Sequence, residues 1–251
     1  MSAIVAIPAR LESNRFPRKV LAEILGKPML WHVHQGVSQA KSVESVWVLS
    51  DSEEILREAA SWGAKTLATS PDCSSGTDRI ASVIERLDAD YVVNVQADEP
   101  LITGDVVDKV VETLIATGAD IATPVFPIQT LADLQNPNLV KVTRSSSGDA
   151  LYFSRSPVPY VRDIPESEWL SQVPFWGHLG VYGYRKQVLM DFPTLPEGVL
   201  EKAEKLEQLR FLEAGQRIAT IEVANRLHGV DTAEDLEIVK DLLAGQSRQQ
   251  G

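Results

Sequence analysis

Hydrophobic and polar positions alternate in long blocks through the first half of the chain. Continuous apolar runs of strand length are followed by longer segments with helical periodicity. The runs predict strands at Ala3–Ala9, Ser45–Ser50, Ala64–Thr69 and Tyr91–Gln96. The intervening segments predict helices over Lys27–Ala40, Asp51–Ser61, Ser74 to about Leu87, and Thr103–Thr117. This alternation is typical of βαβ units, so we expect a mainly parallel sheet with the loops that follow its strands gathered at one edge.

The second half of the chain has a less regular pattern. It predicts strands at Ile121–Pro127, Leu139–Arg144, Ala150–Arg155, Gly177–Tyr184 and Ile218–Ala224, and helices over Leu200–Ala214 and Thr232–Leu243. A Pro-rich polar segment over 156–174 is long for a loop in a compact domain, so it is either functional or part of a subunit contact. We therefore expect one domain over 1–245, with an excursion at about 150–185 and a frayed tail at 246–251.

The composition of the chain argues against some classes of binding partner and favours one type of cellular compartment. The chain has 251 residues and a formal net charge of -11, and this acid excess argues against nucleic-acid binding, which needs a basic surface. The single cysteine, Cys73, favours a reducing compartment. Neither a signal peptide nor an apolar run of membrane-spanning length is visible, so the sequence predicts a cytoplasmic protein without a membrane partner.

A group of cations directly after the first predicted strand stands out in this acidic chain. Arg10, Arg15, Arg18 and Lys19 lie within ten residues of one another. Loops at the carboxyl edge of a parallel sheet are where open α/β folds bind ligands, and Arg and Lys donate charged hydrogen bonds to phosphates. Our hypothesis is that this loop binds a nucleoside triphosphate; the alternative is a solvated turn. Walker A and Gly-x-Gly-x-x-Gly motifs are absent from the sequence, which argues against P-loop and dinucleotide-binding proteins.

Two aspartates are candidate ligands for Mg²⁺, which takes one or two protein carboxylates together with phosphate oxygens. Asp98 follows the predicted strand that ends at Gln96 and is preferred to Glu99, which has room to turn away. Asp231 precedes the last predicted helix. For each of them the alternative role is ordinary helix capping.

Three further segments offer polar groups with weaker signals. Ser74 to Arg79 supplies hydroxyls and backbone N–H groups at a helix start, suited to a base edge or an anion. His178 to Tyr184 carries polar groups in an apolar strand. On the predicted Leu200–Ala214 helix, Glu204, Glu207 and Gln208 share one face by their spacing, and a solvated face is the default interpretation.

Taken in order, these residues resemble the CMP-KDO synthetases, the 3-deoxy-manno-octulosonate cytidylyltransferases. The resemblance runs from about residue 3 to 240. In the first half it rests on Pro8 to Arg10, Ser13 to Arg15, Pro17, Lys19, Gly26 to Pro28, Ser75 to Thr77, and Val95 to Pro100 except Ala97. In the second half it rests on Ala150 to Arg155, His178 to Tyr182, Leu206 to Arg210, Val230 to Thr232, and Glu234 to Leu236.

The resemblance implies a Rossmann-like α/β nucleotidyltransferase fold with helices on both faces of a mainly parallel sheet. It also implies a smaller mixed-sheet excursion that builds a homodimer contact. The reaction would be CTP + 3-deoxy-D-manno-octulosonate (KDO) giving CMP-KDO and diphosphate, for lipopolysaccharide or cell-surface polysaccharide biosynthesis. The sugar's C2 hydroxyl would attack the α-phosphorus in line, with Mg²⁺ as cofactor and catalysis by positioning and electrostatics.

The resemblance also implies a role for each candidate residue. Arg10 and Lys19 would bind the triphosphate, with help from Arg15. Asp98 and Asp231 would hold Mg²⁺. The cytidine would be surrounded by Pro8, Ala9, Ser74, Ser75, Arg79 and Gln96. The sugar acid would be bound by Arg155, His178, Tyr182, Glu207 and Gln208.

The chain departs from the family pattern at four positions. Family members usually have Gly at position 18, Pro at 20, Gly at 97 and Pro at 233, where this chain has Arg18, Val20, Ala97 and Ala233. None of these changes removes a chemical group that the mechanism needs. Two alternatives stay open: a related sugar acid such as 8-amino-KDO as substrate, or a catalytically idle nucleotide-binding protein on the same scaffold.

Overall fold

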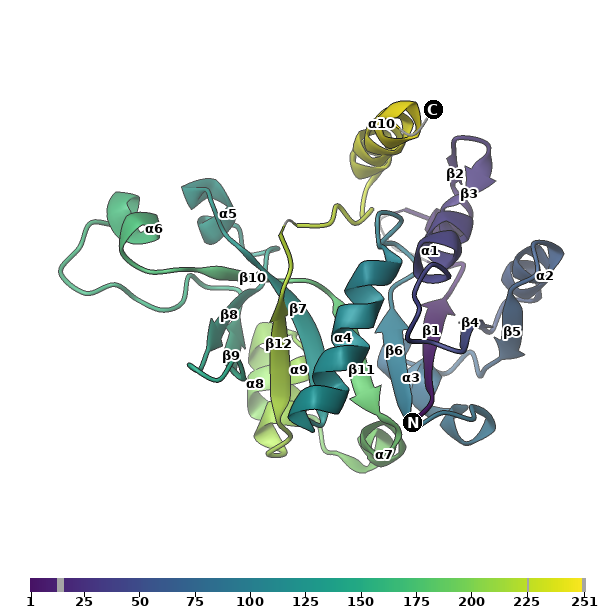
Figure 1. Ribbon diagram of the computed structural model, residues 1–251, viewed down its shortest axis with the longest axis horizontal. Helices are drawn as coiled ribbons and strands as arrows, with labels where there is room; N and C mark the ends of the chain where they lie inside the picture. Colours follow the sequence, from purple (N-terminus) through teal and green to yellow (C-terminus); the bar gives the residue numbers. More distant parts are fainter. Residues whose placement is uncertain (13–15, 225, 250–251) are drawn as a thin grey trace.

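The computed structural model describes residues 1–12, 16–224 and 226–249 of the chain. Its main feature is a sheet of ten strands in the order β5-β4-β1-β6-β11-β7-β10-β8-β9, with β12 paired to β7 (Figure 1). A separate two-stranded hairpin is formed by β2 (Glu23–Ile24) and β3 (Lys27–Pro28). The prediction of an α/β fold is confirmed.

One half of the sheet is parallel, as the sequence predicts. Its strands are β1 (Ala3–Ala9), β4 (Ser45–Ser50), β5 (Lys65–Ala68) and β6 (Tyr91–Val95). The hydrophobic side chains of β1 alternate between two cores, because successive residues of a strand point to opposite faces. Val5 and Ile7 pack with α1 (Met29–Val37), α2 (Glu53–Ser61) and α4 (Gly104–Thr117). Ile4 and Ala6 pack on the other face, with α3 (Gly76–Ala81) and α7 (Lys186–Asp191).

The other half of the sheet is mixed. It contains β7 (Ile121–Pro127), β8 (Lys141–Arg144), β9 (Ala150–Ser154), β10 (Trp176–His178), β11 (Val181–Arg185) and β12 (Ile218–Glu222). The single strand predicted over Gly177–Tyr184 is wrong, because the chain divides between two strands there. β11 pairs antiparallel with β6, whereas β10 pairs with the far end of β7 and with β8. The excursion therefore continues the main sheet instead of forming a smaller sheet of its own.

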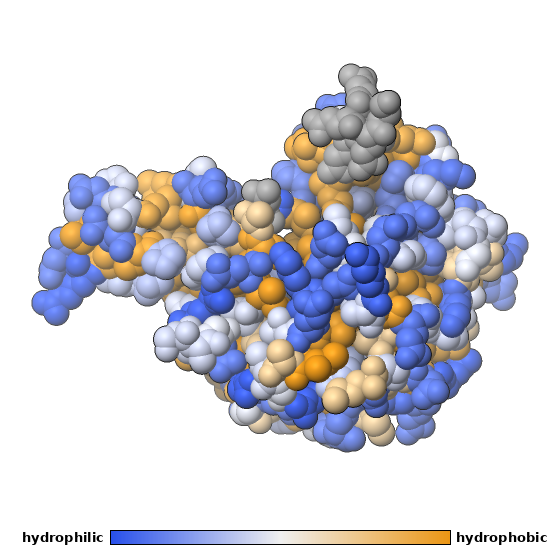
Figure 2. Space-filling view, viewed as in Figure 1, coloured by the Kyte–Doolittle hydropathy of each residue, from blue (hydrophilic) through white to orange (hydrophobic). Residues whose placement is uncertain are grey.

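Two segments, one before β8 and one between β9 and β10, form an arm that stands off from the rest of the molecule, so the arm begins before the predicted excursion at about 150–185 (Figures 1 and 2). It carries α5 (Leu131–Gln135), the 3₁₀ turn Glu166–Glu168 and α6 (Trp169–Gln172). A local hydrophobic cluster that includes Leu134, Trp169 and Phe175 packs its interior. This local core explains how a long Pro-rich segment is ordered there.

The helix predicted over Leu200–Ala214 is broken in the structure. It forms α8 (Val199–Glu204) and α9 (Gln208–Glu213), separated by Lys205 in the left-handed region with φ 53°. The break is supported by Arg155, whose side chain donates to the carbonyl oxygens of Glu204 at 2.7 Å and Lys205 at 3.3 Å. Glu204 therefore does not share a continuous helical face with Glu207 and Gln208.

Other predicted helices differ at their ends. Lys27 and Pro28 belong to β3, so α1 begins at Met29, and α3 ends at Ala81 before a 3₁₀ turn at Ile84–Arg86. The last helix, α10 (Ala233–Gln249), extends beyond the predicted end at Leu243. It packs against the β2–β3 hairpin through a cluster that includes Ile24, Val230 and Val239. Within the described part of the chain, no helix has the length and apolar character needed to cross a membrane.

Candidate active site

Two adjoining cavities lie at the carboxyl edge of the parallel strands, and Asp98 lines both of them. The first has a volume of about 170 Å³ and lies between β1, α3 and β6. The second has a volume of about 580 Å³ and lies between β6, the base of the arm and the segment before α10. We call them the first cavity and the second cavity.

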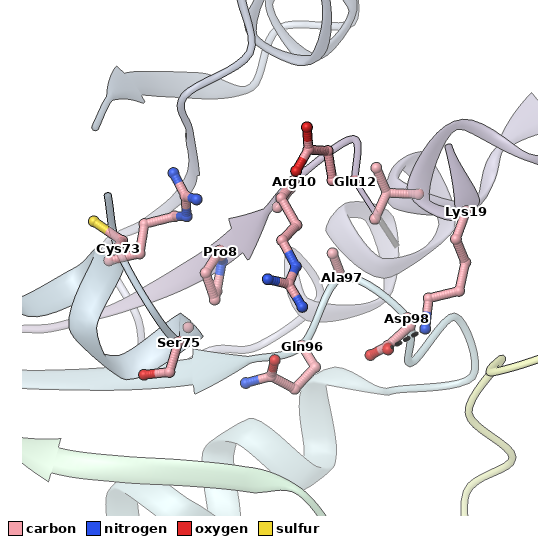
Figure 3. Close-up of a pocket in the computed structure, with 13 residues that line it drawn as sticks. Pro8, Arg10, Glu12, Lys19, Cys73, Ser75, Gln96, Ala97 and Asp98 are labelled. Carbon is pink, nitrogen blue, oxygen red and sulfur yellow. Dashed lines mark hydrogen bonds and ion pairs between the residues drawn. The ribbon is translucent and has the colours of Figure 1, made fainter. Parts of the chain in front are cut away.

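The first cavity collects most of the residues predicted to bind the nucleotide. It is lined by Pro8, Ala9, Arg10, Lys19, Ser75, Arg79, Gln96 and Asp98, together with others that include Val20, Cys73, Gly76 and Ala97 (Figure 3). Ser74 is not among the described residues that line it. The prediction that loops after separate strands meet at one edge is confirmed.

Local chemistry explains the shape of this cavity at the start of α3. The Ser75 hydroxyl accepts a hydrogen bond from the Asp78 amide at 3.1 Å, and the Asp78 carboxylate accepts from the Ser74 amide at 2.9 Å, an arrangement similar to a capping box. The next residue must be small. A β-carbon at Gly76 would come within 3.0 Å of Pro8 Cγ and 3.4 Å of the Gln96 amide group.

Arg79 has a different environment from the one predicted. Only 4% of it is exposed, and its guanidinium forms an ion pair with Asp51 at 3.1 Å and a hydrogen bond with the Thr69 hydroxyl. These partners follow β4 and β5. Arg79 therefore joins the loops behind the cavity, and only part of it contributes to the lining.

The predicted cations separate into different environments. The Arg10 side chain points into the first cavity toward Gln96 and Ala97 (Figure 3). Arg18 has φ 59° and turns away, forming a bidentate ion pair with Glu54 of α2. Arg15 lies outside the described residues. The loop thus directs Arg10 and Lys19 to the cavity and Arg18 to the neighbouring helix.

Lys19 joins the two predicted metal ligands. Its ammonium lies 2.7 Å from Asp98 Oδ2 and 3.3 Å from Asp231 Oδ1, although the aspartates are 133 positions apart. The Val230 amide also donates to the Asp98 carbonyl oxygen at 2.9 Å, which holds the segment before α10 against the end of β6. The described residues contain no group of three or more metal-binding His, Cys, Asp or Glu side chains. Two converging carboxylates match a hard cation that completes its coordination with substrate oxygens.

Glu99 lies beside these aspartates and also lines the second cavity, where its carboxylate faces Gly229. Its Oε2 atom is buried without a hydrogen-bond partner among the described residues. Burial, together with the negative charge of Asp98, raises its pKa to about 8. Its carboxylate also restricts Gly229, where a β-carbon would lie 3.0 Å from Glu99 Oε1. The preference for Asp98 over Glu99 as a metal ligand stays a prediction.

The second cavity contains two of the residues predicted to bind the sugar acid, Arg155 and His178. Three carbonyl oxygens accept hydrogen bonds from the Arg155 guanidinium: those of Glu204, Lys205 and, at 3.0 Å, Pro137. A guanidinium has five N–H groups, so donors remain for a carboxylate. Arg155 thus has a structural task in addition to the predicted one.

His178 is held as a neutral imidazole. Its Nε2 lies 2.9 Å from the Thr123 hydroxyl, which itself donates to the Val181 carbonyl oxygen at 2.8 Å. The Nε2 atom therefore carries the hydrogen and donates to Thr123. Burial lowers the pKa of His178 to about 3. Tyr182 packs against the imidazole with a ring separation of 5.1 Å.

Glu207 and Gln208 lie on the α9 side and are not among the described residues that line the second cavity. The Glu207 carboxylate accepts hydrogen bonds from the hydroxyls of Ser75 and Thr77, while burial raises its pKa. It therefore supports the start of α3 and links α9 to the first cavity. Gln208 is buried, with 6% of it exposed.

Several residues of the second cavity were missed by the sequence interpretation. Asn136, Asn138, Arg226 and His228 line it, and none of them was selected from the sequence. They come from the segment before β8 and the segment before α10, neither of which carries a recognisable pattern. The one usable signal is the sequence Asn-Pro-Asn at 136–138, because these residue types favour a turn.

Comparison with known proteins agrees with this architecture. A family model described as cytidylyltransferase matches residues 4–218, so the fold and site define a cytidylyltransferase. A 3-deoxy-manno-octulosonate cytidylyltransferase from Geobacter sulfurreducens is 43% identical over 97% of this chain and 100% of its own length. The corresponding protein from Escherichia coli is 41% identical over 96% of each chain. The chain belongs to the 3-deoxy-manno-octulosonate cytidylyltransferase family.

Solved structures support the same assignment. The structure of a CMP:2-keto-3-deoxy-manno-octonic acid synthetase complexed with CTP superposes with a TM-score of 0.92 at 39% identity, covering 98% of this chain and 100% of that one. A cytidylyltransferase from Leptospira borgpetersenii gives a TM-score of 0.62 at 16% identity and shares the fold. The predicted family and enzyme class are confirmed.

Proposed function

We propose that this chain transfers the cytidylyl group of CTP to KDO, giving CMP-KDO and diphosphate. The activated sugar would serve the synthesis of lipopolysaccharide or a related surface polysaccharide. The first cavity would bind CTP and the second KDO. Family membership and the full-length similarity to proteins named for this activity support the reaction.

The observation that carries the proposal is the shared position of Asp98. It lines both cavities, and Lys19 joins it to Asp231 of the second cavity. A phosphorus atom bound in one cavity and a hydroxyl bound in the other would meet beside this group. Transfer between two bound substrates needs such a junction, because the attacking oxygen must approach in line with the leaving group.

We propose Asp98 and Asp231 as the residues that hold Mg²⁺. Both supply hard carboxylate oxygens, and both already neutralise one shared cation, the Lys19 ammonium. Mg²⁺ held there would neutralise phosphate charge and favour ionisation of the attacking hydroxyl.

The residues of this chain would then act by binding and orienting the two substrates. Arg10, which points into the first cavity, would bind the phosphates and neutralise the charge that develops on the leaving diphosphate. Lys19 would keep the aspartates together. Arg15, as a further phosphate ligand, completes the proposed set, together with the residues proposed to bind the sugar acid: Arg155, His178, Tyr182, Glu207 and Gln208. No covalent enzyme intermediate is needed.

The test is release of diphosphate with each of the four nucleoside triphosphates, with and without KDO, and with EDTA. We expect release only when CTP, KDO and Mg²⁺ are present together. Equal rates with UTP or ATP would exclude the cytidylyl assignment. Faster turnover of 8-amino-KDO than of KDO would identify 8-amino-KDO as the preferred substrate. Tight CTP binding without turnover of any sugar acid would identify a catalytically idle nucleotide-binding protein.

We also propose that the chain forms a homodimer through the arm. β9 is the edge strand of the sheet and carries Leu151 with 62% exposure, while Tyr160 of the arm is 76% exposed. Large apolar side chains at an unpaired strand edge favour association. Analytical ultracentrifugation at micromolar concentration is expected to show a dimer, and Leu151→Lys is expected to weaken it.

A further inference from the structure

A short turn between α5 and β8 forms one wall of the second cavity. Asn136, Asn138 and Leu139 all contribute to the lining. The turn is closed by two bonds: the Leu139 amide donates to the Asn136 carbonyl oxygen at 3.1 Å, and the Asn138 amide to Asn136 Oδ1 at 2.9 Å. Amide side chains both donate and accept, so this wall suits a polyhydroxylated ligand. We call residues 136–139 the Asn turn.

Lys141 lies behind this wall and outside the lining that the structure describes. It is completely buried, with 0% exposure. Its ammonium donates to the carbonyl oxygens of Asn136 at 2.9 Å, Leu139 at 2.7 Å and Arg155 at 2.5 Å. An ammonium group has three N–H donors, and each of them has one carbonyl oxygen as its acceptor here. An uncompensated buried charge would be costly, and the three carbonyl oxygens provide the compensation.

The same three oxygens connect separate segments of the second cavity. Two of them belong to the Asn turn and the third to Arg155 at the end of β9. The Arg155 side chain donates to the Pro137 carbonyl oxygen of the Asn turn. The backbone amide of Arg155 donates to the Glu204 carboxylate at 3.0 Å. Burial and the nearby Arg155 guanidinium lower the pKa of Lys141, an effect that Glu204 opposes. The Asn turn, β9 and the end of α8 thus form one hydrogen-bonded unit organised around Lys141.

We infer that Lys141 is a positioning residue for the sugar-acid subsite: its ammonium sets the Asn turn and Arg155 in the places where they contact the sugar acid. This inference rests on the proposed function. Lys141 acts through other residues and does not touch the substrate. Neither the Asn turn nor Arg155 is among the described residues that line the first cavity, so loss of Lys141 should affect the binding of KDO and not that of CTP.

The test is Lys141→Met, which keeps a similar volume but leaves three buried carbonyl oxygens without their donor. We expect the KM for KDO to rise about tenfold to a hundredfold, as the loss of one or two well-placed hydrogen bonds to the sugar acid does. The KM for CTP should stay within about twofold, and CTP binding measured by calorimetry should be retained. Lys141→Gln keeps two N–H donors without the charge, so its KM for KDO should be intermediate.

The matched control is Lys186→Met. Lys186 also donates to one carbonyl oxygen, that of Leu87 at 2.7 Å, but it lies at the opposite end of the sheet among Ala89, Tyr91 and Met190. Its loss should lower the melting temperature without changing either KM. If Lys141→Met does not fold, the comparison is made with Lys141→Gln.

Two results would overturn the inference. One is a KM for KDO that is unchanged in a folded Lys141 variant of an active enzyme. The other is an equal rise of KM for both substrates that follows the fall in melting temperature, as a general structural role would produce. Failure of the proposed function is distinguishable, since the unmodified chain would then show no KDO-dependent diphosphate release.

Discussion

The two cavities are built in different ways, and the difference explains what each depends on. The first cavity lies at the ends of β1 and β6 and at the start of α3, within the parallel half of the sheet. Its lining residues lie on or after β1, β5 and β6 and before the next strand of the chain. The second cavity joins Asp98, the Asn turn, the β10–β11 break and the segment before α10, which are spread from position 98 to 235. Its geometry therefore depends on long-range contacts such as those of the Arg155 side chain with the carbonyl oxygens of Glu204 and Lys205.

The strongest test of the junction between the cavities is removal of either carboxylate that Lys19 joins there. Asp98→Asn and Asp231→Asn are each expected to reduce turnover about a thousandfold or more, because the charge beside the reacting groups is lost. The melting temperature should change little, since both side chains are partly exposed. Diphosphate release and thermal unfolding are measured together. Asp105→Asn, an exposed position in the first turn of α4, is the control.

Near-normal turnover in either aspartate variant would exclude that residue as a metal ligand. A variant that loses activity only together with its fold would point to capping, the alternative that the sequence left open.

Removing a cation of the first cavity should affect one substrate only. Arg10→Gln is expected to raise the KM for CTP about tenfold to a hundredfold, corresponding to the loss of one or two charged hydrogen bonds. The KM for KDO should be unchanged. Steady-state kinetics with each substrate varied in turn would measure this, and the result is the reverse of that expected for Lys141→Met. A parallel rise in both KM values would show that the cavities are not independent.

The folded state should lose stability in acid through His178, a residue of the second cavity. The folded pKa of His178 is about 3, below its ordinary value of 6.5, so between these pH values the unfolded chain binds a proton that the folded chain does not. The stabilisation is present above about pH 6.5 and is lost as the pH falls toward 3, with a slope of up to about 1.4 kcal/mol per pH unit. Urea unfolding from pH 7 to 4 measures it.

His178→Gln retains an N–H donor for Thr123 and does not titrate, so its stability should fall less steeply over the same pH range. Identical slopes for the two proteins would show that His178 is not protonated on unfolding in this range.

The smallest effect is expected at Arg18, where the chain departs from the glycine usual in the family. Arg18→Gly removes the ion pair with Glu54 but relieves a residue with φ 59°. Because the pair is exposed, the two effects are small and opposed, and the KM for CTP should change less than about threefold. Measurements at low and high salt, with Glu54→Gln as the partner variant, would reveal a larger role. A tenfold change would show that this pair positions Lys19.

The prediction from sequence was most successful where function follows directly from local pattern. Buried runs located β1, β4 and β6, and the polar residues after them, such as Arg10, Lys19 and Asp98, do meet in one cavity. The same reasoning was wrong where tertiary contacts override local preference. The helical periodicity of Leu200–Ala214 is real, yet Arg155 supports a break at Lys205. The apolar run over Gly177–Tyr184 is divided because its first part pairs with β7 and β8, whereas its second part pairs with β6 and the start of β7.

The sequence by itself determined the fold class, the family and the ends of strands at which chemistry occurs, because period-two and helical patterns and strand-terminal motifs are local properties. Only the tertiary structure decided which distant groups became neighbours. It placed Lys19 between two aspartates, brought Arg79 to Asp51, turned Glu207 toward Ser75, and brought the carbonyl oxygen of Arg155 to Lys141. Such partners depend on chain packing and burial, which no spacing along the sequence encodes.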